Sequence, residues 1–141
     1  LNNRSYVLYY NETNPQFQYQ PGKRWRISLQ YKYANKVNAY GISGERSEIH
    51  NAGLEIKYNT PAKGSLTARF NYLRVAFNAT ENTALAYDML EGYKKGNNAT
   101  WNLAWQRNLS EHLQMNLVYD GRQTAGNKTV HVGSVQLRAY F

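Results

Sequence analysis

The clearest pattern along the chain is strict alternation of apolar and polar residues. In the first long example, Trp25, Ile27, Leu29, Tyr31 and Tyr33 alternate with Arg24, Arg26, Ser28, Gln30 and Lys32. A period of two predicts a strand with one apolar and one polar face. Ten residues in register match a membrane-crossing strand of about 9–11 residues. They exceed the usual globular strand of about 5–6 residues.

The same alternation recurs along the chain. It predicts strands within Glu48–Asn59, Leu66–Tyr72, Trp101–Gln106 and Leu113–Asp120, with a shorter aromatic strand at Ser5–Tyr10 and a second short piece around Phe17 and Tyr19. The predicted turns Thr60–Gly64 and Asn108–Glu111 are short, whereas the loops Asn35–Arg46 and Asp120–Lys128 are longer. Short turns on one side and long loops on the other are typical of outer-membrane barrels.

Two regions depart from this rhythm. After Tyr72 the apolar set shifts to Leu73, Val75 and Phe77, which predicts either a β-bulge near Leu73 or emergence of the strand from a bilayer. Between Asn78 and Asn98 the pattern is least regular. We expect a strand from Thr83 to about Leu90 there, with a short helix as the alternative.

The segment Thr129–Phe141 predicts a closing strand. Val135, Leu137, Ala139 and Phe141 share one parity, while Ser134, Gln136 and Arg138 share the other. A last strand that runs to a terminal aromatic resembles the closing strand of Gram-negative outer-membrane β-barrels. The alternative is the terminal strand of a soluble sandwich.

Together these segments give seven or eight strands in one domain over residues 1–141. We expect an all-β fold: an antiparallel up-and-down β-barrel of the outer-membrane type. It would have about eight strands, or would be the C-terminal part of a larger barrel if the chain is a fragment. A soluble β-sandwich is the alternative, in which the outward faces of the strands would be polar.

Composition supports the β interpretation. Thirteen Tyr and three Trp favour pleated surfaces, and seventeen Asn and ten Gly favour turns. No apolar run approaches the roughly 20 residues of a transmembrane helix, and the lack of Cys excludes disulfides and thiolate metal sites. The net charge of +8 raises the question of nucleic-acid binding, but the basic residues are spread over every strand, so no nucleic acid partner is predicted.

The two parities define two candidate surfaces. We expect the apolar and aromatic set to face lipid: Trp25, Ile27, Leu29, Tyr31, Leu54, Ile56, Phe70, Trp101, Leu103, Trp105, Leu117, Tyr119, Leu137 and Phe141. We expect a polar network in the lumen: Arg26, Lys32, Glu55, Lys57, Arg69, Gln106, Asn116, Asp120, Gln136 and Arg138. In a narrow barrel this set would plug the lumen, and in a wider one it would line an anion-favouring channel.

The sequence predicts neither a catalytic residue nor a metal or cofactor site. The three histidines, His50, His112 and His131, lie on different segments without paired-ligand spacing. His131 and Ser134 invite comparison with outer-membrane lipid-modifying hydrolases, the enzymatic alternative. Residues three apart in a strand face opposite sides, however, so these two cannot form a Ser-His contact.

The segment Ala86–Phe141 contains Tyr-x-Met-Leu-x-Gly, a Gly-Asn turn followed by Trp, and Tyr-x-Gly-Arg before a final Phe, carried by Tyr87, Met89, Leu90, Gly92, Gly96, Asn97, Trp101, Tyr119, Gly121, Arg122 and Phe141. With these motifs it resembles the C-terminal region of large cell-envelope proteins of Bacteroidetes. It implies the tail of a longer surface-associated protein and transfers no activity.

The expected function is therefore that of an outer-membrane protein with a structural, anchoring or pore and transport role in the cell envelope. Its expected partners are membrane lipid and other proteins of an envelope complex. The alternative is a secreted or cell-surface β-sandwich module that binds glycan through Trp and Tyr.

Overall fold

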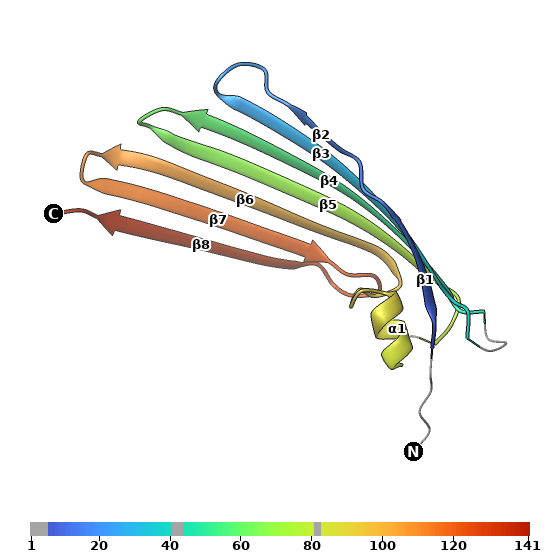
Figure 1. Cartoon of the computed structure of the whole chain (residues 1–141). Helices are drawn as coiled ribbons and strands as arrows, with labels where there is room; N and C mark the ends of the chain where they lie inside the picture. Colours follow the sequence, from blue (N-terminus) through green and yellow to red (C-terminus); the bar gives the residue numbers. More distant parts are fainter. Residues whose placement is uncertain (1–5, 41–43, 81–82) are drawn as a thin grey trace.

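The computed structural model describes residues 6–40, 44–80 and 83–141. These form one antiparallel sheet and a single short helix, in the order β1 (Leu8–Thr13), β2 (Gln16–Tyr19), β3 (Trp25–Asn38), β4 (Arg46–Thr60), β5 (Gly64–Phe77), α1 (Ala84–Met89), β6 (Gly96–Ser110), β7 (Leu113–Gln123) and β8 (Val130–Ala139). Consecutive strands from β3 to β8 pair with one another, and β1 and β2 both pair with β3. The molecule is thus an all-β meander, drawn as a single curved sheet in Figure 1.

The sheet is open. Within the described residues β8 pairs only with β7, and β1 and β2 pair only with β3, so both edges are free. The all-β antiparallel architecture expected from the sequence is confirmed, but a barrel closed by these eight strands is not formed. Alternation along each strand determines the faces of a sheet, but it contains no information about how far the sheet curls.

The connections differ at the two ends of the sheet. The turns β4–β5 and β6–β7 are tight, the latter consisting of Glu111 and His112. The β3–β4, β5–β6 and β7–β8 connections at the opposite end are longer, and the β5–β6 connection holds α1. We call these the turn end and the loop end of the sheet (Figure 1).

The long strands follow the predicted alternation, with local corrections at their ends. β1 is Leu8–Thr13, whereas the predicted Ser5–Tyr10 began outside the described residues. β6 continues to Ser110, so its turn comes later than predicted, and a register shift lies between Asn108 and Ser110. The closing strand β8 ends at Ala139, and Phe141 lies beyond it, fully exposed.

The predicted bulge near Leu73 is wrong. Pairing runs without interruption through Leu73, which lies opposite Asn51 on β4 and Asn98 on β6. Leu73, Val75 and Phe77 therefore stay on the same face as Arg69, and the face itself changes from polar to apolar near the loop end. The predicted strand Thr83–Leu90 is also wrong, since this segment contains α1, the short helix that the sequence left as the alternative.

Packing of α1 on the sheet explains why the face that carries Arg69 becomes apolar near the loop end. Ala86, Met89 and Leu90 pack with Ala34, Ile49, Leu73, Val75 and Phe77 in the principal buried cluster of the described chain. Thr83 caps the helix by accepting a hydrogen bond at Oγ1 from the Ala86 N–H at 3.0 Å. A six-residue helix has little stability of its own, so contact with the sheet holds it in place.

Candidate membrane surface and polar face

One face of the sheet is apolar across all the long strands, and we call it the apolar face. Cross-strand pairing aligns its side chains in rows that run from β3 to β8. The rows are Trp25, Tyr58, Leu66, Trp105, Leu117 and Val135; then Ile27, Ile56, Ala68, Leu103, Tyr119 and Gly133; then Leu29, Leu54, Phe70, Trp101, Gly121 and His131. A fourth row begins Tyr31, Ala52, Tyr72 and Ala99.

This face is uncovered in the described chain. Leu29 and Phe70, both in the third row, are 48% and 45% exposed. Along a strand, the first row and the fourth are about 20 Å apart at the rise of an extended chain. This approaches the outward apolar band of membrane barrels, about 25 Å tall. The protein therefore presents a broad apolar surface of membrane-like height.

Aromatic residues border the band toward the turn end. The rings of Trp25 and Tyr58 lie 4.5 Å apart between centroids. The Arg107 guanidinium lies 5.9 Å from the centroid of the Trp105 ring. Amphipathic rings and cations at one rim match the interfacial girdle of membrane proteins.

One tyrosine–histidine pair borders the band toward the loop end, on β3 and β4, and a second lies in the second and third rows, on β7 and β8. The Tyr31 hydroxyl lies 2.7 Å from His50 Nδ1, and the Tyr119 hydroxyl lies 2.7 Å from His131 Nδ1. The first pair presents polar groups among apolar rings, as an interfacial girdle requires.

Trp101 packs across the backbone of β7 at Gly121. A Cβ built on Gly121 would overlap the Trp101 ring, so only glycine leaves room for the indole. Trp101 Nε1 also donates a hydrogen bond of 3.4 Å to the Tyr119 hydroxyl. The ring thus fills the space that the missing side chain leaves on the apolar face.

The opposite face, which we call the polar face, carries charged groups along its middle. Glu55 on β4 pairs with Lys57 Nζ at 3.1 Å and with the Arg69 guanidinium on β5. Asn102 Nδ2 donates a hydrogen bond of 2.6 Å to Asp120 Oδ1. These contacts pair several of the polar groups that face one another there.

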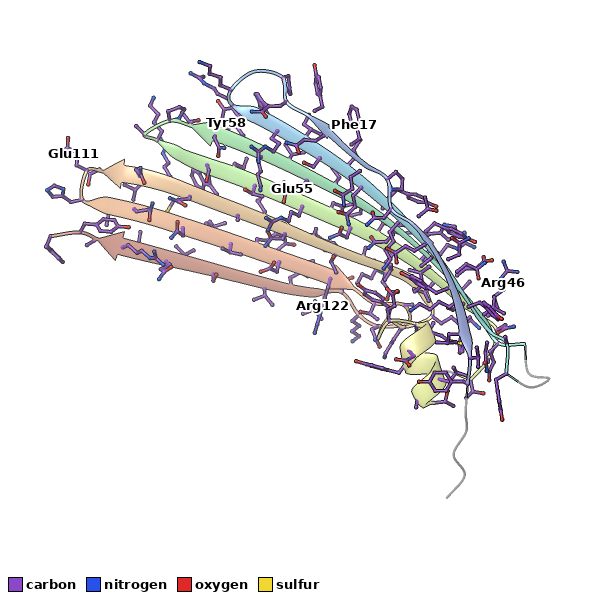
Figure 2. The ribbon with its side chains drawn as sticks, in the orientation of Figure 1. Phe17, Arg46, Glu55, Tyr58, Glu111 and Arg122 are labelled. Atoms are coloured by element: carbon purple, nitrogen blue, oxygen red, sulfur yellow. The ribbon has the colours of Figure 1, made fainter. Side chains whose placement is uncertain are left out.

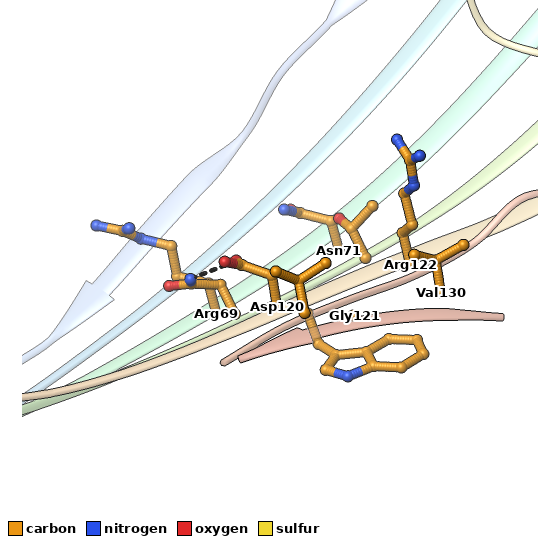
Figure 3. A pocket seen from close by; sticks show the side chains of 10 residues that line it. Arg69, Asn71, Asp120, Gly121, Arg122 and Val130 are labelled. Atoms are coloured by element: carbon orange, nitrogen blue, oxygen red, sulfur yellow. Dashed lines mark hydrogen bonds between the residues drawn. The ribbon is translucent and has the colours of Figure 1, made fainter. Parts of the chain in front are cut away.

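A hollow of about 570 Å³ lies on the polar face over β5 to β8. Its lining includes Arg69, Asn102, Asp120 and Arg122. Figure 3 shows the Arg69 and Arg122 side chains on two sides of Asp120, whose hydrogen bond with Asn102 is dashed. The hollow is thus open, with two arginines among the residues that line it.

Near the loop end, the segment around α1 is fastened to the polar face. Ser47 Oγ donates a hydrogen bond of 2.8 Å to the Met89 carbonyl. Glu91 pairs with Lys32 Nζ at 3.0 Å and with Lys36 Nζ at 3.1 Å. The Tyr6 hydroxyl donates a hydrogen bond of 2.7 Å to Asp88 Oδ2.

These contacts perturb the ionisation of Glu91. Partial burial of the carboxyl opposes its charged form, but the hydrogen bonds and positive charges of Lys32 and Lys36 outweigh that effect. The pKa of Glu91 is therefore lowered from its ordinary value. The ion pairs with both lysines hold at neutral pH.

The register fixes where the predicted site residues lie. All the predicted lipid-facing residues except Phe141 lie on the apolar face, and all ten predicted lumen residues lie on the polar face. His131 and Ser134 lie on opposite faces. The register places these residues on faces but does not determine what each face contacts.

The sequence interpretation missed the residues around α1. Glu91 and Asp88 lie in or beside the segment taken for a strand, and Glu12 was assigned no role although it lies 3.6 Å from Lys32 Nζ. One signal for the helix was present: Thr83 has the chemistry of an N-cap, Gly92 can follow a helix end, and Ala86, Met89 and Leu90 have helical spacing. The ion pairs of Glu91 and Glu12 with Lys32 join residues distant in sequence, so the local sequence gives no signal for them.

No helix within the described residues is long and apolar enough to span a membrane. In the same residues, no three His, Asp or Glu side chains gather as metal ligands would. Comparisons with protein-family models, curated proteins and solved structures found no match to this chain. A functional inference must therefore come from the two faces of the sheet.

Proposed function

We propose that this protein forms part of the wall of an outer-membrane β-barrel, with the apolar face toward lipid and the polar face toward the interior. The observation that carries the proposal is the uncovered apolar band, bordered by aromatic residues at both rims and continuous across β3 to β8. In water such a surface is a large exposed apolar patch, which soluble monomers rarely carry. In a bilayer it is matched by acyl chains.

The length of the strands supports the same proposal. β3 to β6 have 14 or 15 residues each, and β7 and β8 have 11 and 10. A tilted membrane-crossing strand needs about 9–11 residues. The excess extends β3, β4 and β5 to the segment around α1, beyond the apolar band.

The free edges require further strands. Unpaired backbone N–H and C=O groups are costly in hydrocarbon, so a sheet in a bilayer must close. Strands of a longer polypeptide, or of other copies of this chain, would complete the barrel against β1, β2 and β8. The resemblance of Ala86–Phe141 to C-terminal regions of Bacteroidetes envelope proteins favours a longer polypeptide.

The polar face supports a pore or transport role more than a purely structural one. Basic side chains outnumber acidic ones on it, counting Arg26, Lys32, Lys36, Lys57, Arg69, Arg122 and Arg138 against Glu12, Glu55, Glu91 and Asp120. A lumen with this surplus favours anions. The segment around α1 would narrow it from the loop end.

A soluble glycan-binding sandwich is the alternative that the exposed Trp and Tyr side chains allow. It would need a second layer over the apolar face, because uncovered rows of Leu, Ile and Phe do not remain in water. Within the described residues the only element packed on a face is α1, and it covers the polar one.

The proposal is tested by reconstitution. The protein is refolded with lipid vesicles, which are then floated in a density gradient and washed with carbonate. We expect β structure that floats with lipid and resists the wash. A folded, monodisperse protein that stays in the aqueous fraction without detergent would contradict the proposal.

A further inference from the structure

The apolar face contains a hollow of about 430 Å³ between β2 and β5. Ala52 lies at its floor, with Tyr31 opposite on β3 and Tyr72 opposite on β5. Leu29, Leu54 and Phe70 continue it toward the turn end, and Phe17 on β2 forms a wall. A small residue between two tyrosines thus leaves an elongated apolar depression.

Cationic and hydrogen-bonding groups lie at the loop-end mouth of this hollow. Two residues beyond Ala52 and Tyr72 toward the loop end, His50 and Arg74 face each other across β4 and β5. Arg74 is exposed and lies on the apolar face. The only described acidic residue of the next row, Glu48, is paired with Arg46 at 2.8 Å.

His50 adds a donor at the same mouth. Its Nδ1 lies 2.7 Å from the Tyr31 hydroxyl, whose own ring lines the hollow. When His50 Nδ1 accepts a hydrogen bond from the Tyr31 hydroxyl, the neutral imidazole carries its hydrogen on Nε2. His50 and Arg74 can therefore both donate to an anion above the hollow.

We propose that this hollow binds one membrane lipid whose phosphorylated headgroup has a net negative charge, with an acyl chain over Ala52 and the phosphate at Arg74 and His50. Charge complementarity argues for this occupant, since an apolar groove that ends at a guanidinium group matches an apolar tail that ends at a phosphate. The inference rests on the proposed function, because only a face in contact with lipid can recruit it.

The test measures lipid retention. The protein is reconstituted in nanodiscs of phosphatidylglycerol and phosphatidylcholine with identical acyl chains, released into mild detergent, and examined by native mass spectrometry. We expect one phosphatidylglycerol to be retained in preference to phosphatidylcholine, by roughly tenfold, the equivalent of one charge-assisted contact.

Two matched pairs of variants locate the site. Arg74→Gln should abolish the preference, whereas Arg107→Gln, an arginine on the same face at the turn end, should preserve it. Ala52→Leu should fill the hollow and release the lipid, whereas Ala68→Leu, elsewhere on the same face, should not.

The results separate this inference from the proposed function. Equal retention of the two lipids, or an unchanged preference in Arg74→Gln, would overturn the lipid site while the protein still floats with vesicles. A protein that enters no nanodisc would overturn both.

Discussion

At the scale of single residues, the packing of the apolar face depends on which residue stands beside each large side chain. Gly121 leaves space for the Trp101 ring, which reaches Tyr119 and lies 5.9 Å from the His131 ring. Gly133, on the neighbouring strand and the same face, borders open space, since a Cβ added there would meet no atom within 4 Å. The two glycines therefore have different roles although both lie in strands of the same face.

Gly121→Ala should displace the Trp101 ring and lower the free energy of unfolding by about 1–3 kcal/mol, as overpacking does. Gly133→Ala should be neutral or slightly stabilising, because alanine costs less chain entropy in a strand than glycine. Urea unfolding in lipid measures both. Equal free energies of unfolding for the two variants would show that Trp101 does not depend on Gly121.

Leu117 and Asn116 are adjacent on β7 and point to opposite faces, with Trp105 and Gln106 as their respective partners on β6. If the apolar face meets lipid, Leu117→Arg should cost about 2–4 kcal/mol near the bilayer midplane. Asn116→Arg should cost much less, because the polar face is hydrated. The free energies of unfolding of the two variants are measured in vesicles. Similar decreases for both would show that the apolar face does not contact lipid while the polar face contacts water.

At the scale of elements, the long strands were predictable, whereas the helix was only the alternative interpretation of its segment. Alternation fixes which residues share a face, and the pairing of Ile56 with Ala68 follows from it once the tight turn at Thr60–Gly64 sets the register. The helix depends on contacts distant in sequence: Met89 with Ser47, and Glu91 with Lys32. The change of apolar parity at Leu73 was interpreted as a bulge because the local sequence does not show that the segment around α1 packs on these residues.

The attachment of α1 should weaken in acid. The pKa of Glu91 is lowered by folding. The stabilisation that its ion pairs give to the attachment of α1 is therefore present at neutral pH and is lost as the pH falls through that lowered pKa. Hydrogen-exchange protection factors for Ala84–Leu90, corrected for the intrinsic effect of pH, should therefore decrease in acid while those of β6 hold.

Glu91→Gln should lower the same protection factors at neutral pH and remove most of their pH dependence. Glu111→Gln, an exposed carboxyl in the turn β6–β7, serves as the control and should leave them unchanged. Full protection of α1 in Glu91→Gln would show that the apolar cluster alone holds the helix.

At the scale of the whole molecule, the sheet has apolar side chains on one face and charged and polar side chains on the other. Figure 2 shows side chains projecting from both sides of the curved sheet, with Tyr58 near the turn end, Phe17 farther along on the edge strand β2, and Arg46 and Arg122 toward the loop end. The sequence predicted this separation, but not that eight strands leave the sheet open, since curvature and closure depend on shear and strand number.

Contact between the apolar face and acyl chains can be measured with probes that the chain already contains. All three tryptophans, Trp25, Trp101 and Trp105, lie on that face. Their fluorescence should be strongly quenched in vesicles of brominated lipid and little affected by aqueous acrylamide. Full fluorescence in brominated vesicles, with strong quenching by acrylamide, would show that this face meets water and not lipid.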